Sequence, residues 1–314
     1  MEKEKNAMQR LNALILEKNS RICAGLDPDW DEILKLKKCE NSFFQPEVLA
    51  KYCTDYINSI YDIVPATNIN IGFFERVKCF DLYFEVAAYA KEKGLFVIGD
   101  INRGGMGSTS AAYAEAFLGE DSPFDAITIN PYLGTDGVMP FLKLAKENGK
   151  GVFVLVKTHN KSSKDIQDLK LEDGRYVYEA VADLVLKWEK EVDPESFNKL
   201  SNLPDYPMVG AVVGTTCREE TGMLVYRIAD TFCLVPEYDD DQSITPHDVA
   251  INFDDDGLGA IVNFSKEIMN AYKKDCWKEY YSEEMWADAA RAEAICRTEE
   301  INNAINKYLG KYIC

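Results

Sequence analysis

Short, unbroken apolar runs alternate along the chain with longer stretches whose apolar positions recur every three or four residues. A brief continuous apolar run is typical of a strand that is buried on both faces, as in a parallel sheet. The runs predict eight strands, at residues 22–26, 67–71, 95–99, 126–129, 151–157, 209–213, 232–235 and 259–263. The periodic stretches predict helices at 46–60, 80–93, 140–148, 176–191, 218–229 and 265–274.

Eight strands that alternate with helices predict an α/β fold, a closed (β/α)8 TIM barrel. A doubly wound sheet is the alternative, because the same alternation would also produce that fold. We expect a single domain over residues 1–314, with a barrel core at about 21–274. The tail at 275–314 is rich in Glu, Ala, Trp and Tyr and predicts one or two extra C-terminal helices packed on the barrel.

Composition and charge exclude several classes of function. The formal net charge of −18 disfavours nucleic-acid binding through a basic patch. No apolar run is long enough to cross a membrane, and no secretory signal follows Met1, so we expect a cytoplasmic protein without a membrane partner. The nine cysteines include no Cys-x-x-Cys pair, and only two histidines occur, so we expect no metal site.

Polar residues gather where the predicted strands end, which is where active-site groups lie in such a barrel. The end of the third strand reads Asp100-Ile101-Asn102-Arg103-Gly104-Gly105-Met106-Gly107-Ser108-Thr109. The other strand ends read Gly25-Leu26-Asp27-Pro28, Asn68-Ile69-Asn70-Ile71-Gly72-Phe73-Phe74-Glu75, Thr128-Ile129-Asn130-Pro131-Tyr132-Leu133-Gly134, Val156-Lys157-Thr158-His159-Asn160 and Val212-Val213-Gly214-Thr215-Thr216.

This series, in order and at this spacing from about residue 21 to 268, resembles the longer bacterial-type branch of the orotidine 5′-monophosphate decarboxylase family. The resemblance implies a carboxy-lyase of pyrimidine biosynthesis that removes CO2 from a pyrimidine nucleotide without metal or organic cofactor. It also implies an alternating array of two Lys and two Asp, in which one Lys protonates the ring carbon. The last Asp of that array reaches in from the neighbouring subunit, so the resemblance implies a homodimer.

The sequence departs from the family pattern at three of these four charges. The motif Asp-x-Lys-x-x-Asp keeps Asp100 but has Asn102 and Gly105 at the other two positions. Asn68 stands where the family has the first Lys. A neutral amide supplies neither a proton nor a positive charge near pH 7. We therefore expect decarboxylation to be lost or strongly reduced.

The positions that the resemblance assigns to ligand binding diverge as well. Asp27 and Thr109 keep the family residues, whereas His159 replaces a pyrimidine-contacting Ser and Lys266 replaces a phosphate-binding Arg. The Gly-rich phosphate loop corresponds to 236–243, where Gln242 remains but every Gly is lost and four carboxylates are gained. Carboxylates repel a phosphate, and Gly normally allows its close approach.

Several interpretations of the function stay open. The chain is an orotidine 5′-monophosphate decarboxylase-like protein with weak or absent activity, a non-catalytic ligand-binding or regulatory barrel, or a relative with new chemistry on a less anionic ligand. The expected partner is a small molecule, with a pyrimidine nucleoside or nucleotide as the leading candidate. Arg103 or Lys266 could resupply a missing charge. Asp239–Asp241 favours a solvated loop over a cation site, because consecutive Asp lack the spacing of a calcium loop.

Overall fold

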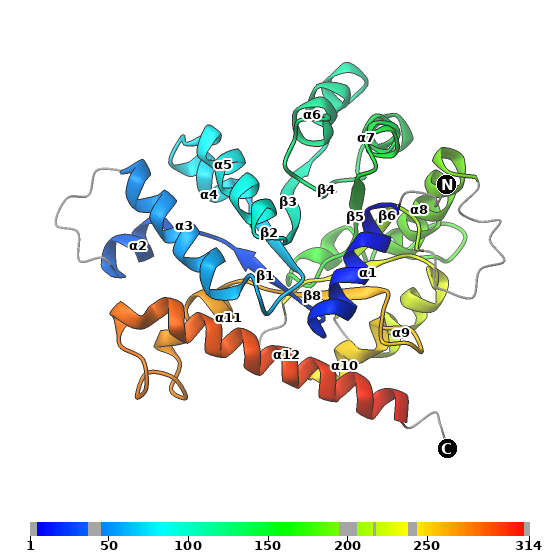
Figure 1. The fold of residues 1–314 in the computed structure, drawn as a ribbon. Coiled ribbons are helices and arrows are strands. Elements are labelled where there is room, and N and C mark those ends of the chain that lie inside the picture. Colours follow the sequence, from blue (N-terminus) through cyan, green and yellow to red (C-terminus); the bar gives the residue numbers. More distant parts are fainter. Residues whose placement is uncertain (1–4, 37–44, 195–205, 216–217, 238–243, 311–314) are drawn as a thin grey trace.

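Eight parallel strands close into a barrel in the computed structural model, which describes residues 5–36, 45–194, 206–215, 218–237 and 244–310 (Figure 1). Each strand pairs with its neighbours in the order of the chain, and the last pairs with the first. The strands are β1 (Ile22–Leu26), β2 (Ala66–Asn70), β3 (Phe96–Arg103), β4 (Ala126–Ile129), β5 (Gly151–Lys157), β6 (Val209–Val213), β7 (Cys233–Val235) and β8 (Ala260–Phe264). The closed order confirms the barrel and excludes the doubly wound sheet.

The strands lie within about four residues of their predicted bounds because nearly every strand residue is buried, as the apolar runs require. Six helices follow the predicted stretches, and they are α3 (Pro46–Ile60), α5 (Phe80–Glu92), α7 (Thr135–Glu147), α8 (Val177–Val192), α9 (Arg218–Arg227) and α11 (Lys266–Met269). The structure also has helices that the periodicity did not predict, at α2 (Trp30–Leu36), α4 (Ile71–Arg76), α6 (Ser108–Leu118) and α10 (Pro246–Val249).

The helix predicted from residue 140 begins five residues earlier, at Thr135. A proline inside a helix normally breaks it, so the sequence favours a start at Pro140. Here Val138 and Phe141 bury one face of α7 and hold the helix together across the proline. The stretch predicted as one helix at 265–274 is α11 followed by a short 3-10 turn at Ala271–Lys273.

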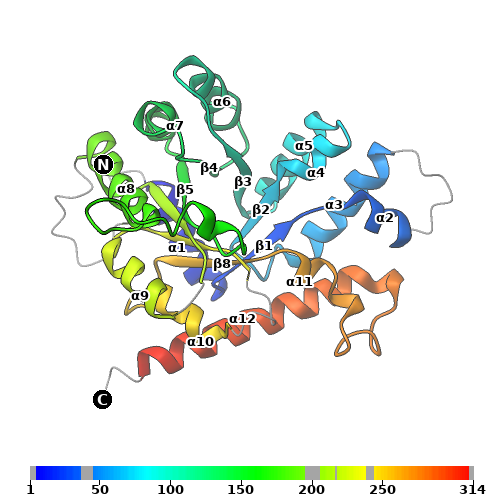
Figure 2. The same cartoon turned by 180° about the vertical axis from the view of Figure 1, so that it is seen from behind.

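The N-terminal helix α1 (Ala7–Lys18) closes the amino end of the barrel, and the sequence pattern did not predict it. Met8, Leu11 and Ile15 are fully buried and belong to the same core cluster as the inward-facing strand residues. Asn6 caps the helix by accepting from the backbone N–H of Gln9. Figure 1 shows α1 in front of the strands, whereas Figure 2 shows the opposite face of the barrel.

The long helix α12 (Trp286–Gly310) crosses one side of the barrel and packs on α3, α10 and α11 (Figures 1 and 2). Trp286 is buried and stacks on Tyr52 of α3, with ring centroids 4.2 Å apart. Together with the turns before it, α12 matches the helical extension expected for the tail. No helix in the described ranges is long and apolar enough to cross a membrane.

Truncating Leu11 should test whether α1 is part of the barrel core. Leu11 is fully buried, whereas Leu16 of the same helix is 58% exposed. We expect Leu11→Ala to lower the free energy of unfolding by about 2–5 kcal/mol and Leu16→Ala by much less. Urea unfolding followed by circular dichroism measures both. Equal, small losses would mean that α1 is not part of the cooperative core.

Candidate functional site

The carboxyl ends of the strands form the barrel mouth opposite α1, because all eight strands are parallel. Asn68 and Asp100 lie on the neighbouring strands β2 and β3. Asp27 follows β1 directly, and Lys266 begins α11 just after β8. The fold therefore brings four of the predicted site residues to the same end of the barrel.

Three neutral side chains hold the Asp100 carboxylate. Asn102 Nδ2 and Thr128 Oγ1 each lie 2.8 Å from its Oδ1, and the side chain of Asn68 forms a further hydrogen bond to the carboxylate. Within the described ranges, Asp100 has no ion pair with a lysine or arginine. Amide and hydroxyl donors thus surround a carboxylate that in the family pattern would stand between lysines.

The backbone fixes which way the Thr128 hydroxyl points. The backbone N–H groups of Ile101 and Asn102 both donate to Thr128 Oγ1, at 3.1 Å each. Because these bonds use the acceptor capacity of the hydroxyl, its one hydrogen goes to Asp100. Asn102 adopts the left-handed backbone conformation, with φ 47°, which asparagine tolerates better than most residues. This turn directs the Asn102 amide back onto Asp100.

Burial raises the pKa of Asp100, because a carboxylate loses hydration energy in the barrel mouth. The hydrogen bonds from Thr128, Asn102 and Asn68 act in the opposite direction, since they stabilise the charged form. These neutral donors do not compensate for the burial. A pKa above the ordinary value is what we expect for a desolvated carboxylate without a nearby cation.

Burial also raises the pKa of Asp27, to about 7. The negative charges of Asp100 and Glu237 act in the same direction, whereas the Lys266 ammonium and a hydrogen bond from Ser265 lower it. The repulsion shows that three carboxylates, from the ends of β1, β3 and β7, share this part of the mouth. The positive charge of Lys266 does not offset the effects of burial and of the two neighbouring carboxylates on the pKa of Asp27.

Ser265 connects two of these carboxylates. Its backbone N–H donates to Glu237 Oε2 at 2.5 Å, and its hydroxyl forms the hydrogen bond to Asp27. Asn263 Nδ2 lies 3.1 Å from the same hydroxyl oxygen. Ser265 packs closely on Gly25, because a Cβ on that glycine would lie only 1.9 Å from the Ser265 Oγ. The glycine in β1 therefore allows Ser265 to pack directly against the strand.

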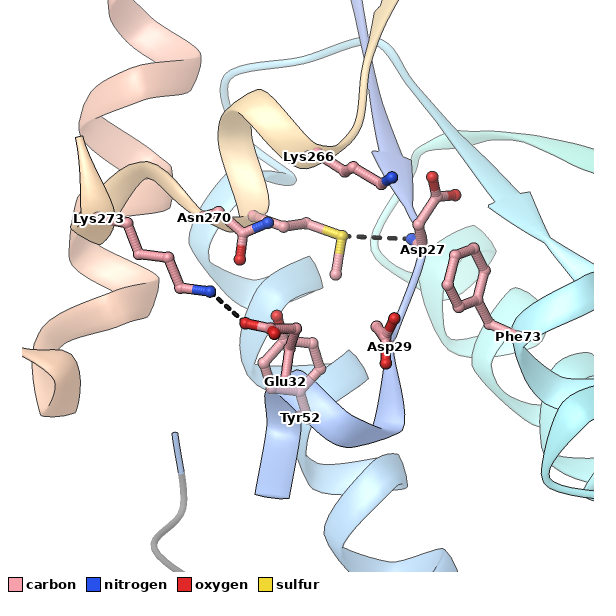
Figure 3. A pocket seen from close by; sticks show the side chains of 9 residues that line it. Asp27, Asp29, Glu32, Tyr52, Phe73, Lys266, Asn270 and Lys273 are labelled. Atoms are coloured by element: carbon pink, nitrogen blue, oxygen red, sulfur yellow. Dashed lines mark hydrogen bonds and ion pairs between the residues drawn. The ribbon is translucent and has the colours of Figure 1, made fainter. Parts of the chain in front are cut away.

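A cavity of about 300 Å³ opens beside Asp27. Figure 3 shows the Lys266 side chain reaching toward Asp27 from α11, and Lys273 turned away to its ion pair with Glu32. The cavity is lined by Asp27, Asp29, Glu32, Tyr52, Phe73, Lys266, Met269, Asn270 and Lys273. Tyr52, Phe73 and Met269 supply apolar surface, and most of the other lining side chains are charged.

Arg103 forms no ion pair with Asp100 in the described part of the chain. Its guanidinium pairs with Glu75 and lies 5.8 Å above the ring of Tyr113. Gly105 is buried in a tight turn, where an added Cβ would lie 2.8 Å from Thr109 Cγ2. Thr109 itself is exposed at the start of α6.

His159 lies half-buried in the loop after β5, against Gly214 at the end of β6. Gln167 holds this loop, because its side chain accepts from the backbone N–H of Thr158 at 2.9 Å. Gln242 and Asp239–Asp241 lie outside the described residues. Among those described, no group of three or more His, Cys, Asp and Glu is placed to hold a metal ion.

Two residues that position the site were not predicted as site residues. Thr128 and Ser265 are neutral, so a comparison of charged positions does not single them out. Their positions along the chain could have indicated a role, because Thr128 lies near the end of β4 and Ser265 directly follows β8. Both positions face the barrel mouth, where a hydroxyl needs a partner.

Comparison with known proteins identifies the family. The model of the orotidine 5′-phosphate decarboxylase / HUMPS family matches residues 20–258. The chain belongs to this family. It is 35% identical over 305 residues to the orotidine 5′-phosphate decarboxylase of Rhodopirellula baltica, covering 93% of this chain and 97% of that one. It is 34% identical over 293 residues to that of Clostridium tetani, covering 93% and 96%.

Solved structures share the barrel. A Leishmania donovani OMP decarboxylase superposes with a TM-score of 0.69 at 25% identity, covering 96% of this chain and 98% of that one. The orotidine 5′-monophosphate decarboxylase of Methanocaldococcus jannaschii, complexed with the inhibitor BMP, has a TM-score of 0.56 at 15% identity, covering 88% and 98%. The second likeness is one of fold alone. This chain is a member of the decarboxylase family in which, among the described residues, no lysine pairs with Asp100.

Replacing Asp27 should change how stability depends on pH. The pKa of Asp27 rises from 3.8 to about 7 on folding, so the folded state binds the proton more tightly. Its contribution to stability is fully present below about pH 4 and is lost as the pH rises through about 7. We expect Asp27→Asn to gain, relative to wild type, on the order of 2 kcal/mol in unfolding free energy between about pH 4 and 8. Urea unfolding across that range tests this, and parallel profiles would contradict it.

Proposed function

We propose that this chain is an orotidine 5′-monophosphate decarboxylase-like protein that has lost most or all of its decarboxylase activity. The observation that carries the proposal is the set of neutral partners around Asp100. Asn102, Thr128 and Asn68 hold it with hydrogen bonds, and no cation stands in their place among the described residues.

The chemistry that the family resemblance implies needs a proton donor and a stabilising positive charge at these positions. An amide at Asn102 or Asn68 has no proton to give near pH 7. The loss of a general acid alone typically slows a reaction by roughly 10²–10⁴-fold. The loss of preorganised charge costs more, because electrostatic stabilisation is usually the largest single contribution to catalysis.

Neither candidate cation compensates for the two asparagines. The guanidinium of Arg103 is engaged by Glu75 and faces Tyr113. The ammonium of Lys266 acts on Asp27, at the β1–β8 side of the mouth, and is not among the groups that hold Asp100.

A second candidate function is that of a ligand-binding or regulatory barrel. The cavity beside Asp27 favours it, because that cavity keeps aromatic walls and polar groups on the rim of the mouth. The ligand that the family relationship suggests is a pyrimidine nucleoside or nucleotide. New chemistry on a less anionic ligand is the third candidate, and the surplus of carboxylates around Asp27 supports that direction.

We propose in addition that the protein is a homodimer that associates through the segment from Asp100 to Thr109. Exposed apolar side chains favour this face: Met106 is 67% exposed, and Tyr132 and Leu133 in the adjacent loop are 78% and 43% exposed. The segment packs closely on the start of α7, since a Cβ on Gly137 would lie 2.9 Å from the Gly105 carbonyl oxygen. A two-fold dimer is also the commonest oligomer.

A decarboxylation assay tests the loss of activity. We expect the purified protein to turn over orotidine 5′-monophosphate many orders of magnitude more slowly than a relative such as the Clostridium tetani enzyme assayed beside it, as followed by ultraviolet absorbance. The double variant Asn68→Lys, Asn102→Lys shows whether two lysines restore any rate. Turnover by the unmodified protein at about 1 per second or faster, an ordinary enzyme rate, would refute the proposal.

Light scattering at micromolar concentration tests the dimer. We expect a dimer for the unmodified protein and a shift toward monomer for Met106→Glu, because a buried unpaired charge opposes association. Met223→Glu is the matched control, since Met223 is 57% exposed on α9. A clean monomer for the unmodified protein would rule out the dimer, and equal effects of both changes would rule out this face.

A further inference from the structure

The ends of β7 and β8 are where barrels of this type commonly bind a phosphate group, through backbone N–H groups and a short extra helix. In this chain that short helix is α11, and the backbone N–H just before it belongs to Ser265. A carboxylate already occupies this donor: Glu237 Oε2 accepts from the Ser265 N–H at 2.5 Å. Glu237 comes two residues after β7 ends.

The residues around this contact are closely packed. Ser265 is 7% exposed, and its hydroxyl is held between Asn263 and Asp27. Gly25 lets it pack against β1 with no free space, because any Cβ there would overlap the Ser265 hydroxyl. An anion that binds the Ser265 N–H would have to displace Glu237, because the Glu237 carboxylate already accepts from that N–H.

We propose that Glu237 takes the place of a ligand phosphate, so that the mouth selects an unphosphorylated, nucleoside-type ligand over the corresponding nucleotide. This inference rests on the proposed function, in which the barrel mouth keeps a ligand site of pyrimidine type. Glu237 is then the residue that determines specificity at the end of the site formed by β7 and β8.

The surrounding charges act in the same direction. A phosphate dianion bound at Ser265 would meet Glu237 first and then Asp27, which lies close enough to Glu237 for the two to repel each other. Lys266 is the described cation that acts on Asp27 beside Ser265. Its attraction for a phosphate would therefore be shared with the Asp27 carboxylate. A hydroxyl group at the same place brings no charge, and it can donate a hydrogen bond to the Glu237 carboxylate.

Calorimetric titration with uridine and with uridine 5′-monophosphate tests the proposal. For the unmodified protein we expect uridine to bind at least as tightly as the nucleotide. Glu237→Gln removes the negative charge and keeps the shape, so we expect it to improve nucleotide affinity relative to uridine by about tenfold or more. Glu219→Gln, at an exposed glutamate on α9, is the matched control and should leave the ratio unchanged.

Circular dichroism melting of each variant shows that it is folded. Nucleotide binding that is clearly tighter than uridine binding in the unmodified protein would overturn the inference. The inference also fails if Glu237→Gln changes both affinities equally, or if neither ligand binds any folded variant. Decarboxylase activity, measured on the same preparations, is a separate readout: turnover of orotidine 5′-monophosphate refutes the proposed function, whereas an unchanged affinity ratio without turnover refutes only the role of Glu237.

Discussion

A half-buried carboxylate held by neutral donors among the described residues determines the character of this barrel mouth. Asp100 accepts from Asn102 and Thr128 at 2.8 Å each, and two backbone N–H groups lock the Thr128 hydroxyl so that its hydrogen points at the carboxylate. A network of this kind satisfies the carboxylate without cancelling its charge. The cost of burying that charge therefore remains, and it raises the pKa of Asp100.

The uncancelled charge at Asp100 shapes its surroundings. It combines with Glu237 to raise the pKa of Asp27 to about 7, second to the burial of Asp27 itself. Ser265, packed against Gly25, then ties Asp27 and Glu237 into one unit. A barrel mouth with these carboxylates disfavours a ligand that carries one negative group near Asp100 and another near Glu237. The same arrangement suits a neutral ligand that brings hydrogen-bond donors.

Periodicity predicted the barrel because its strands are buried on both faces, so each appears as an apolar run, as in Val209–Val213. It missed α1, whose polar beginning conceals the buried face of Met8, Leu11 and Ile15. The motif predicts replaced charges at Asn68, Asn102 and Gly105, and this stays a prediction. The partners that hold Asp100 were not predicted, because the left-handed turn at Asn102 and the orientation of Thr128 depend on pairing between strands.

The ionisation of Asp100 itself can be measured most directly by carboxyl ¹³C NMR titration of the unmodified protein. The signal is assigned from its absence in Asp100→Asn. We expect a pKa above the ordinary aspartate value of 3.8, because burial outweighs the three neutral donors. A pKa at or below that value would mean that burial does not outweigh the groups that stabilise the charged form, and it would contradict the claim that burial of a carboxylate without a nearby cation governs this mouth.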